Sequence, residues 1–151
     1  SQIKDNYKFD IITLFDVLEH VPNPNDLLRD LKTKLSKEGF LIITCPNWNS
    51  LERYIFQNDW KAIDPQHYYY FTKKSIRNNL KKANLKIIKI KTRNFNPFQS
   101  KKIQYKKSLK KRNATELRSF VSKGLGFFIK KIFNYLLNLF SLGSTLEVIC
   151  K

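Results

Sequence analysis

The chain alternates between short apolar runs and polar segments that carry helix signals. Residues 9–15 and 40–45 are mostly apolar and β-branched, which predicts strands buried on both faces of a sheet. Residues 85–93 carry partly alternating lysines and predict a more exposed strand, and residues 144–150 predict a closing strand. Strand, helix and strand at this spacing are typical of a βαβ unit. The pattern therefore predicts an α/β fold with an open sheet.

Helix signals lie between these runs. Asn23 and Pro24 predict a helix start, and Gly39 predicts its end, after Lys34 and Lys37 in the last turn. Four leucines form its inward stripe, namely Leu27, Leu28, Leu31 and Leu35.

Three further helices follow along the chain. A short helix is predicted near residues 50–57, and Thr72 predicts the cap of a helix that runs to about Ala83, where Asn84 ends it. A longer helix is predicted over about residues 114–142, with a break near its two glycines.

The formal net charge of +17 raises the question of nucleic-acid or membrane binding. Most of the basic residues are lysine, as in chains from AT-rich genomes, whereas phosphate recognition favours arginine. Residues 99–131 nevertheless contain eleven Lys or Arg and one acid, Glu116. Cys45 and Cys150 lie on predicted core strands without metal-site spacing, which predicts buried free thiols.

The candidate chemistry lies where the first strand ends. Asp16, Glu19 and His20 follow that strand, and His67, the second of only two histidines, precedes the helix capped by Thr72. The carboxyl edge of an open α/β sheet is where ligands bind. Carboxylates and imidazoles there can act as bases or bind a divalent cation.

Four segments resemble class I S-adenosylmethionine-dependent methyltransferases, in the branch of the ubiquinone-pathway O-methyltransferases. They are residues 7–24, 27–47, 67–85 and 143–150. The resemblance implies a partial Rossmann-like, doubly wound sheet whose last strand is antiparallel. It also implies S-adenosylmethionine as cofactor, with Phe15, Asp16 and Val17 at the cofactor cleft.

The same resemblance implies alternative roles for the acid–histidine motif. In metal-dependent members, an acid-x-x-acid-His motif binds the ion, which here corresponds to Asp16, Glu19 and His20, with His67 as a further ligand. Mg²⁺ or another divalent cation would then hold the acceptor hydroxyl. Alternatively His20 is the catalytic general base, or these residues have a structural role.

One departure concerns the family's glycine-rich cofactor loop, which no segment of this sequence matches. We therefore expect the chain to be the C-terminal part of a methyltransferase, with three strands upstream. Its expected parts are the core half over residues 1–93, a basic arm and helical insertion over 94–142, and the closing strand over 143–151.

The expected activity is O-methylation of a small molecule, a sugar or a lipid-linked intermediate. A nucleic-acid-binding module or an RNA-terminus methyltransferase is an alternative, although no RNA-end recognition segment is present and nucleic acid is disfavoured. An inactive fragment is the other alternative. Nothing resembles a signal peptide, and a cytoplasmic protein is expected.

Two segments have open roles. The aromatic residues between positions 47 and 71 could stack on a planar substrate or form a lid packed on the sheet. Residues 125–142 form an amphipathic pattern with central lysines, which suits either a lid over the substrate pocket or peripheral contact with an anionic membrane.

Overall fold

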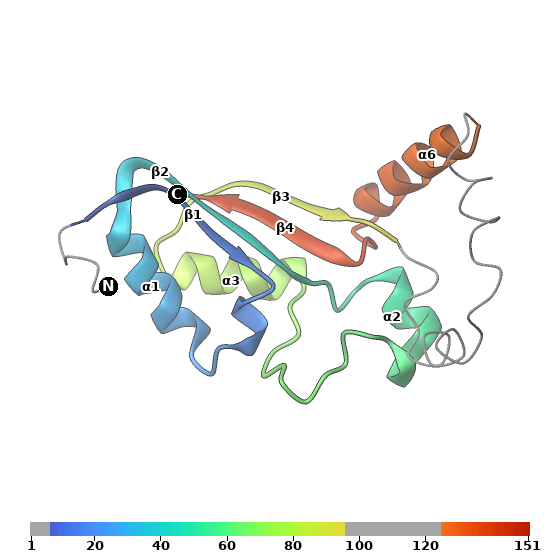
Figure 1. Cartoon of the computed structure of the whole chain (residues 1–151), viewed down its shortest axis with the longest axis horizontal. Helices are drawn as coiled ribbons and strands as arrows, with labels where there is room; N and C mark the ends of the chain where they lie inside the picture. Colours follow the sequence, from blue (N-terminus) through green and yellow to red (C-terminus); the bar gives the residue numbers. More distant parts are fainter. Residues whose placement is uncertain (1–6, 96–124) are drawn as a thin grey trace, which may run out of the picture.

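The computed structural model describes residues 7–95 and 125–151 (Figure 1). Its strands form one four-stranded sheet in the order β1-β2-β4-β3. The strands are β1 (Phe9–Phe15), β2 (Leu35–Pro46), β3 (Ile87–Arg93) and β4 (Thr145–Cys150). β1 and β2 are parallel, and β4 runs antiparallel between β2 and β3. The open α/β sheet and the antiparallel closing strand are therefore confirmed.

Helices α1 and α3 pack on one face of this sheet (Figure 1). The helices are η1 (Leu18–His20), α1 (Pro24–Lys34), α2 (Leu51–Phe56), η2 (Gln57–Asp59), α3 (Lys73–Lys82) and α6 (Leu125–Leu139). Alternate residues of the central strands, such as Ile43 and Val148, are fully buried in a core shared with Leu28 and Leu80 of these helices. Period-two alternation places one set of side chains in that core.

The predicted end of the first helix is wrong. α1 ends at Lys34, and Leu35 begins β2, where it pairs with Phe9 of β1. Gly39 is a strand residue, and a Cβ atom there would lie 2.7 Å from the carbonyl oxygen of Phe9. The glycine therefore permits a close approach of two strands, and strand pairing ends the helix earlier than the local signals do. Asn23 occupies the N-cap position without a side-chain hydrogen bond.

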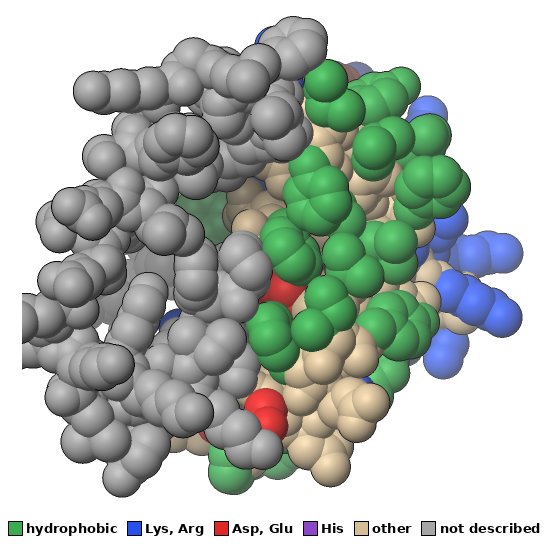
Figure 2. All heavy atoms as spheres, turned by 90° about the vertical axis from the view of Figure 1, so that its right-hand side faces the viewer, with side chains coloured by type: hydrophobic (Ala, Val, Ile, Leu, Met, Phe, Trp, Pro, Cys, Tyr) green, Lys and Arg blue, Asp and Glu red, His purple; other side chains and the backbone are tan. Residues whose placement is uncertain are grey.

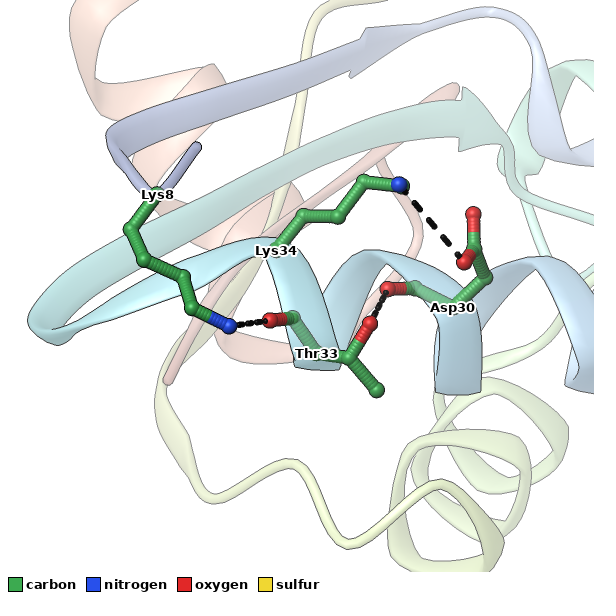
Figure 3. Close-up of polar contacts among 4 residues, drawn as sticks. All are labelled: Lys8, Asp30, Thr33 and Lys34. Atoms are coloured by element: carbon green, nitrogen blue, oxygen red, sulfur yellow. Dashed lines mark hydrogen bonds and ion pairs between the residues drawn. The ribbon is translucent and has the colours of Figure 1, made fainter. Parts of the chain in front are cut away.

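One hydrogen bond joins the residue before β1 to the end of α1 (Figure 3). The Lys8 ammonium donates to the carbonyl oxygen of Thr33, whose hydroxyl donates to the carbonyl of Asp30 at 2.7 Å. Lys34 lies 4.0 Å from the Asp30 carboxylate. Only the Lys8 bond joins the chain before β1 to α1, while the two contacts of Asp30 lie within the helix.

The predicted short helix near residues 50–57 and the predicted Thr72 cap of α3 are confirmed. Ser50 accepts a hydrogen bond from the backbone N–H of Arg53, and Thr72 forms a capping box with Ser75. Asn84 has a φ of 55°, the left-handed conformation that ends α3.

α6 confirms a helix before the closing strand, and it ends at Leu139 rather than at the predicted residue 142. Of the predicted break, Leu125 and Gly126 lie within α6, while Gly124 and the predicted start near residue 114 lie outside the described residues. Within the described ranges, no helix is long and apolar enough to cross a membrane.

Candidate functional site at the end of β1

The site begins where β1 ends. Asp16 has a φ of 53°, a left-handed conformation that Asp adopts more readily than most residues. Its backbone N–H donates to the carbonyl of Thr44 at 3.0 Å, and the Thr44 hydroxyl lies 3.4 Å from its carboxylate. The backbone reversal at Asp16 turns the chain out of the sheet and into η1.

η1 places Glu19 and His20 beside one another, with Leu18 buried beneath them. Glu19 is 1% exposed, and within the described ranges neither of its carboxylate oxygens has a hydrogen-bond partner. Burial raises the pKa of Glu19 above its ordinary value, and the Asp16 carboxylate adds to the effect. The residue's own backbone N–H dipole and the neighbouring His20 act in the opposite direction on this pKa. A buried carboxylate without a partner is costly unless a ligand compensates it.

The two histidines are oriented in the same way. Nδ1 of His20 lies 3.0 Å from the carbonyl oxygen of Gln66, and Nδ1 of His67 lies 2.8 Å from that of Ala62. Because a carbonyl only accepts, each Nδ1 is the protonated donor in the neutral ring, and each Nε2 keeps its lone pair. The ring centroids lie 4.5 Å apart in an edge-to-face arrangement. Metal-binding histidines are commonly held by such a bond to a carbonyl.

Three of the four predicted metal ligands come together. One ligand atom from each of Glu19, His20 and His67 lies within 4.8 Å of the other two, while Asp16 is outside this group. All four residues line one cavity of about 310 Å³, here called the site cavity. Its other lining residues are Pro46, Trp60, Lys61, Ala62, Asp64, Ser144 and Thr145.

Several contributors to the site were not predicted. Lys61, Asp64 and Thr145 line the site cavity, and the backbone N–H groups of Tyr68 and Tyr69 donate to the carbonyl of Glu19 at 2.9 and 3.3 Å. The Asp-Pro pair at 64–65 is a turn signal that could have placed Asp64 near His67. Backbone groups have no sequence signature, so the carbonyls that orient the histidines could not be anticipated.

The aromatic segment packs on itself. Trp48 lies 6.2 Å from Trp60 and 4.9 Å from Tyr70 between ring centroids, and Tyr70 contacts His67 at 5.9 Å. The Arg53 guanidinium stacks over Trp48 at 4.3 Å and borders a second cavity of about 390 Å³. These rings have aromatic partners, whereas Tyr54 and Tyr68 of the same segment are exposed, so the segment offers both a packed part and accessible rings.

The residues predicted at the cofactor cleft are accessible at this edge. Phe15 is 59% exposed and Val17 is 39% exposed, on either side of the turn at Asp16. Apolar side chains this exposed beside a polar cavity are available to contact a bound ligand.

Comparison of the sequence with known families shows to which family the chain belongs. A family model described as "Methyltransferase domain" matches residues 1–90, which include β1, β2, α3 and the site residues. The chain belongs to this methyltransferase-domain family. The Ubiquinone biosynthesis O-methyltransferase of Glaesserella parasuis serovar 5 (strain SH0165) is 49% identical over 45 residues, which are 30% of this chain and 19% of that protein.

Solved structures share the fold of this methyltransferase domain. A SAM-dependent methyltransferase from Archaeoglobus fulgidus is similar with a TM-score of 0.56 and 18% identity, over 95% of this chain and 59% of that one. A SAM-dependent methyltransferase from Thermotoga maritima is described as a possible histamine N-methyltransferase. It is similar with a TM-score of 0.57 and 15% identity, over 97% of this chain and 58% of that one. The chain thus spans somewhat more than half the length of these structures, and its sheet has their fold.

Proposed function

We propose that this chain supplies the acceptor side of an S-adenosylmethionine-dependent methyltransferase that methylates a hydroxyl group. The grouping of Glu19, His20 and His67 in a cavity at the carboxyl end of β1 carries the proposal. This is the edge at which ligands bind in open α/β sheets. Membership of the methyltransferase-domain family supports methyl transfer, and the O-methyltransferase relative supports oxygen as the acceptor atom.

Phe15, Asp16 and Val17 would line the cofactor site from this side. The exposed Phe15 and Val17 offer apolar surface to a planar ring, and Asp16 offers a carboxylate at the rim of the site cavity. When bound, S-adenosylmethionine supplies an activated methyl group, so the protein chiefly orients the acceptor against it.

His20 would accept the proton of the acceptor hydroxyl. Its Nδ1 is bonded to the Gln66 carbonyl, so its Nε2 is the basic atom. The acceptor is a small molecule, a sugar or a lipid-linked intermediate in this proposal. The site cavity of about 310 Å³ is large enough for a reacting ring rather than for a whole lipid.

Glu19, His20 and His67 would instead hold a divalent cation in the metal-assisted form of the proposal. The orphaned Glu19 carboxylate and the two free Nε2 atoms support this form. Two imidazoles with one carboxylate favour a transition ion such as Mn²⁺ or Zn²⁺ over Mg²⁺, which prefers oxygen ligands. When bound, the ion lowers the pKa of a neighbouring hydroxyl.

The activity test uses the longest natural protein that contains this chain. Transfer of a labelled methyl group from S-adenosylmethionine to a catechol probe should yield a methyl ether, detected by mass spectrometry. The His20→Ala variant should lower turnover by about 100-fold or more, in the range for a lost general base. Lys74→Ala, on an exposed position of α3, is the matched control. Undiminished turnover in His20→Ala would contradict the proposal.

A separate test distinguishes the metal-assisted form from the metal-free form. Mn²⁺ titrated into the chain, followed by electron paramagnetic resonance, should show one bound ion, lost in Glu19→Gln and in His67→Ala. Turnover in the longer protein should then fall in EDTA and recover with Mn²⁺. Full activity in EDTA with no bound Mn²⁺ would exclude the metal-assisted form and leave His20 as the base.

A further inference from the structure

Helix α6 turns its apolar side outward. Six large apolar side chains of α6 and the residue that follows it are exposed, and they are here called the outer face: Ile132, Phe133, Tyr135, Leu136, Leu139 and Phe140. At 3.6 residues per turn these positions share one side of the helix. Surface helices of globular proteins normally turn this side towards the core. The apolar side of α6 therefore faces solvent rather than the core.

Polar groups on the other side attach α6 to the sheet. The Asn138 side-chain oxygen accepts a hydrogen bond from the backbone N–H of Thr92 at 2.9 Å. The Thr92 hydroxyl donates to the carbonyl of Leu137 at 3.2 Å, and Leu137 itself is buried. Because these bonds fix the rotation of the helix, the outer face cannot also reach the core.

The outer face lies apart from the site cavity. None of residues 131–140 lines the site cavity or the cavity beside Arg53. The prediction that this helix covers the substrate pocket therefore finds no support in these residues. Figure 2 looks onto the end of the molecule that carries α6 and shows hydrophobic side chains gathered over one area, with Lys and Arg at its border and acidic side chains between and below them. A contiguous exposed apolar area marks an interaction surface.

The positive charge of the chain favours an anionic partner for the outer face. The sequence of α6 contains no acidic residue, Lys131 is exposed on it, and residues 99–131 carry eleven basic residues and one acid. Two copies of a chain with a formal net charge of +17 would repel each other. An anionic lipid surface would instead attract the lysines and accept the apolar side chains.

We infer that the outer face of α6 docks the protein on an anionic membrane surface. The helix lies along the interface, with Leu139 and Phe140 inserted below the headgroups and the exposed Lys131 beside the lipid phosphates. Its 15 residues extend about 22 Å, less than the roughly 30 Å hydrocarbon core, so the contact is peripheral. The inference does not depend on the proposed function.

Co-sedimentation of the chain with lipid vesicles tests the inference. The protein should pellet with phosphatidylglycerol-containing vesicles at low salt, bind more weakly as salt rises, and stay in solution with pure phosphatidylcholine. The double variant Leu139→Asp/Phe140→Asp should weaken binding by about tenfold or more, because it places charges on the inserted side. Its circular dichroism spectrum should match that of the parent.

The matched control is Tyr68→Asp/Ile88→Asp, which adds the same charge at two similarly exposed apolar positions elsewhere. This control should bind vesicles at least half as well as the parent. If both double variants bind equally, the lysines alone hold the protein and the outer face has no role. If the parent does not bind anionic vesicles at low salt, the inference is wrong, and concentration-dependent elution in gel filtration would then identify a second copy as the partner.

Discussion

Asn47 joins the end of β2 to the approach to β4. It is 1% exposed, and its side-chain amide donates to the carbonyls of Ser141 at 2.9 Å and Gly143 at 2.7 Å. Its backbone N–H donates to the carbonyl of Ser144 at 2.8 Å. Ser144 lines the site cavity, so one buried side chain holds the loop that borders the proposed active site.

Replacing Asn47 by Ala should lower the free energy of unfolding by about 2 kcal/mol, because two carbonyls lose their donor in a buried place. Urea denaturation followed by tryptophan fluorescence measures the change. Asn58→Ala, at an exposed position of η2, is the control and should change stability by less than about 0.5 kcal/mol. Equal midpoints for the two variants would show that the Asn47 bonds contribute nothing.

The two cysteines should be chemically inert in the folded chain. Both are fully buried and free, and burial raises the pKa of the Cys150 thiol to about 12. Burial, together with the nearby Glu19 and Asp16 charges, also raises the pKa of Cys45. A raised thiol pKa leaves very little thiolate, the reactive form, at pH 8.

A thiol reagent such as DTNB at pH 8 should therefore label neither cysteine in the native chain and both after unfolding in urea. Rapid native labelling of one thiol would mean that its strand opens readily.

At the scale of elements, the boundary between α1 and β2 depends on contacts that are distant in sequence. The local signals favour a helix as far as Gly39, whereas pairing with Phe9 begins the strand at Leu35. The register of the two strands shifts between Phe9 and Ile11, opposite the place where Gly39 approaches the Phe9 carbonyl. The glycine therefore serves the strand pair rather than the end of a helix.

Gly39→Ala should destabilise the chain by about 1–3 kcal/mol, because the new methyl group meets a backbone atom that cannot turn away. Thermal unfolding measures the loss. Lys37→Ala, at an exposed position of the same strand, should leave the melting temperature nearly unchanged. A stable Gly39→Ala variant would indicate that β1 and β2 can separate there without cost.

At the scale of the whole molecule, the proposed cofactor contacts among the described residues form only one wall. Phe15, Asp16 and Val17 come from a single strand end, and the sequence holds no glycine-rich loop between a strand and a helix. On the face of the sheet opposite α1 and α3, Ile11 and Phe15 are exposed. The chain spans 59% and 58% of the two structures that share its fold.

Calorimetric titration of residues 1–151 with S-adenosylmethionine should accordingly give no saturable heat. The expected reason is that one strand end supplies too few contacts to offset the cost of ordering the ligand. S-adenosylhomocysteine, titrated in parallel, should behave in the same way. One-to-one saturable binding of either compound would show that the chain forms a complete cofactor site by itself.

The sequence alone was sufficient for the presence of the four strands and for the cap of α3. Apolar runs predicted β1 and β4, Thr72 predicted the start of α3, and the acids and histidine after β1 predicted a candidate site, whose residues line one cavity in the structure. These features depend on local propensity and on the period of two in strands, which are properties of neighbouring residues.

Only the tertiary structure decided how distant groups meet. It brought His67 to Glu19 and His20 and left Asp16 outside their group, because carbonyls of residues 62 and 66 orient the two rings. The tertiary structure also set the rotation of α6 about its axis. The apolar pattern of this helix does not fix that rotation, because such a pattern suits a core or a membrane equally well. Hydrogen bonds from Thr92 to residues 137 and 138 fixed that rotation by holding the polar side of the helix against β3.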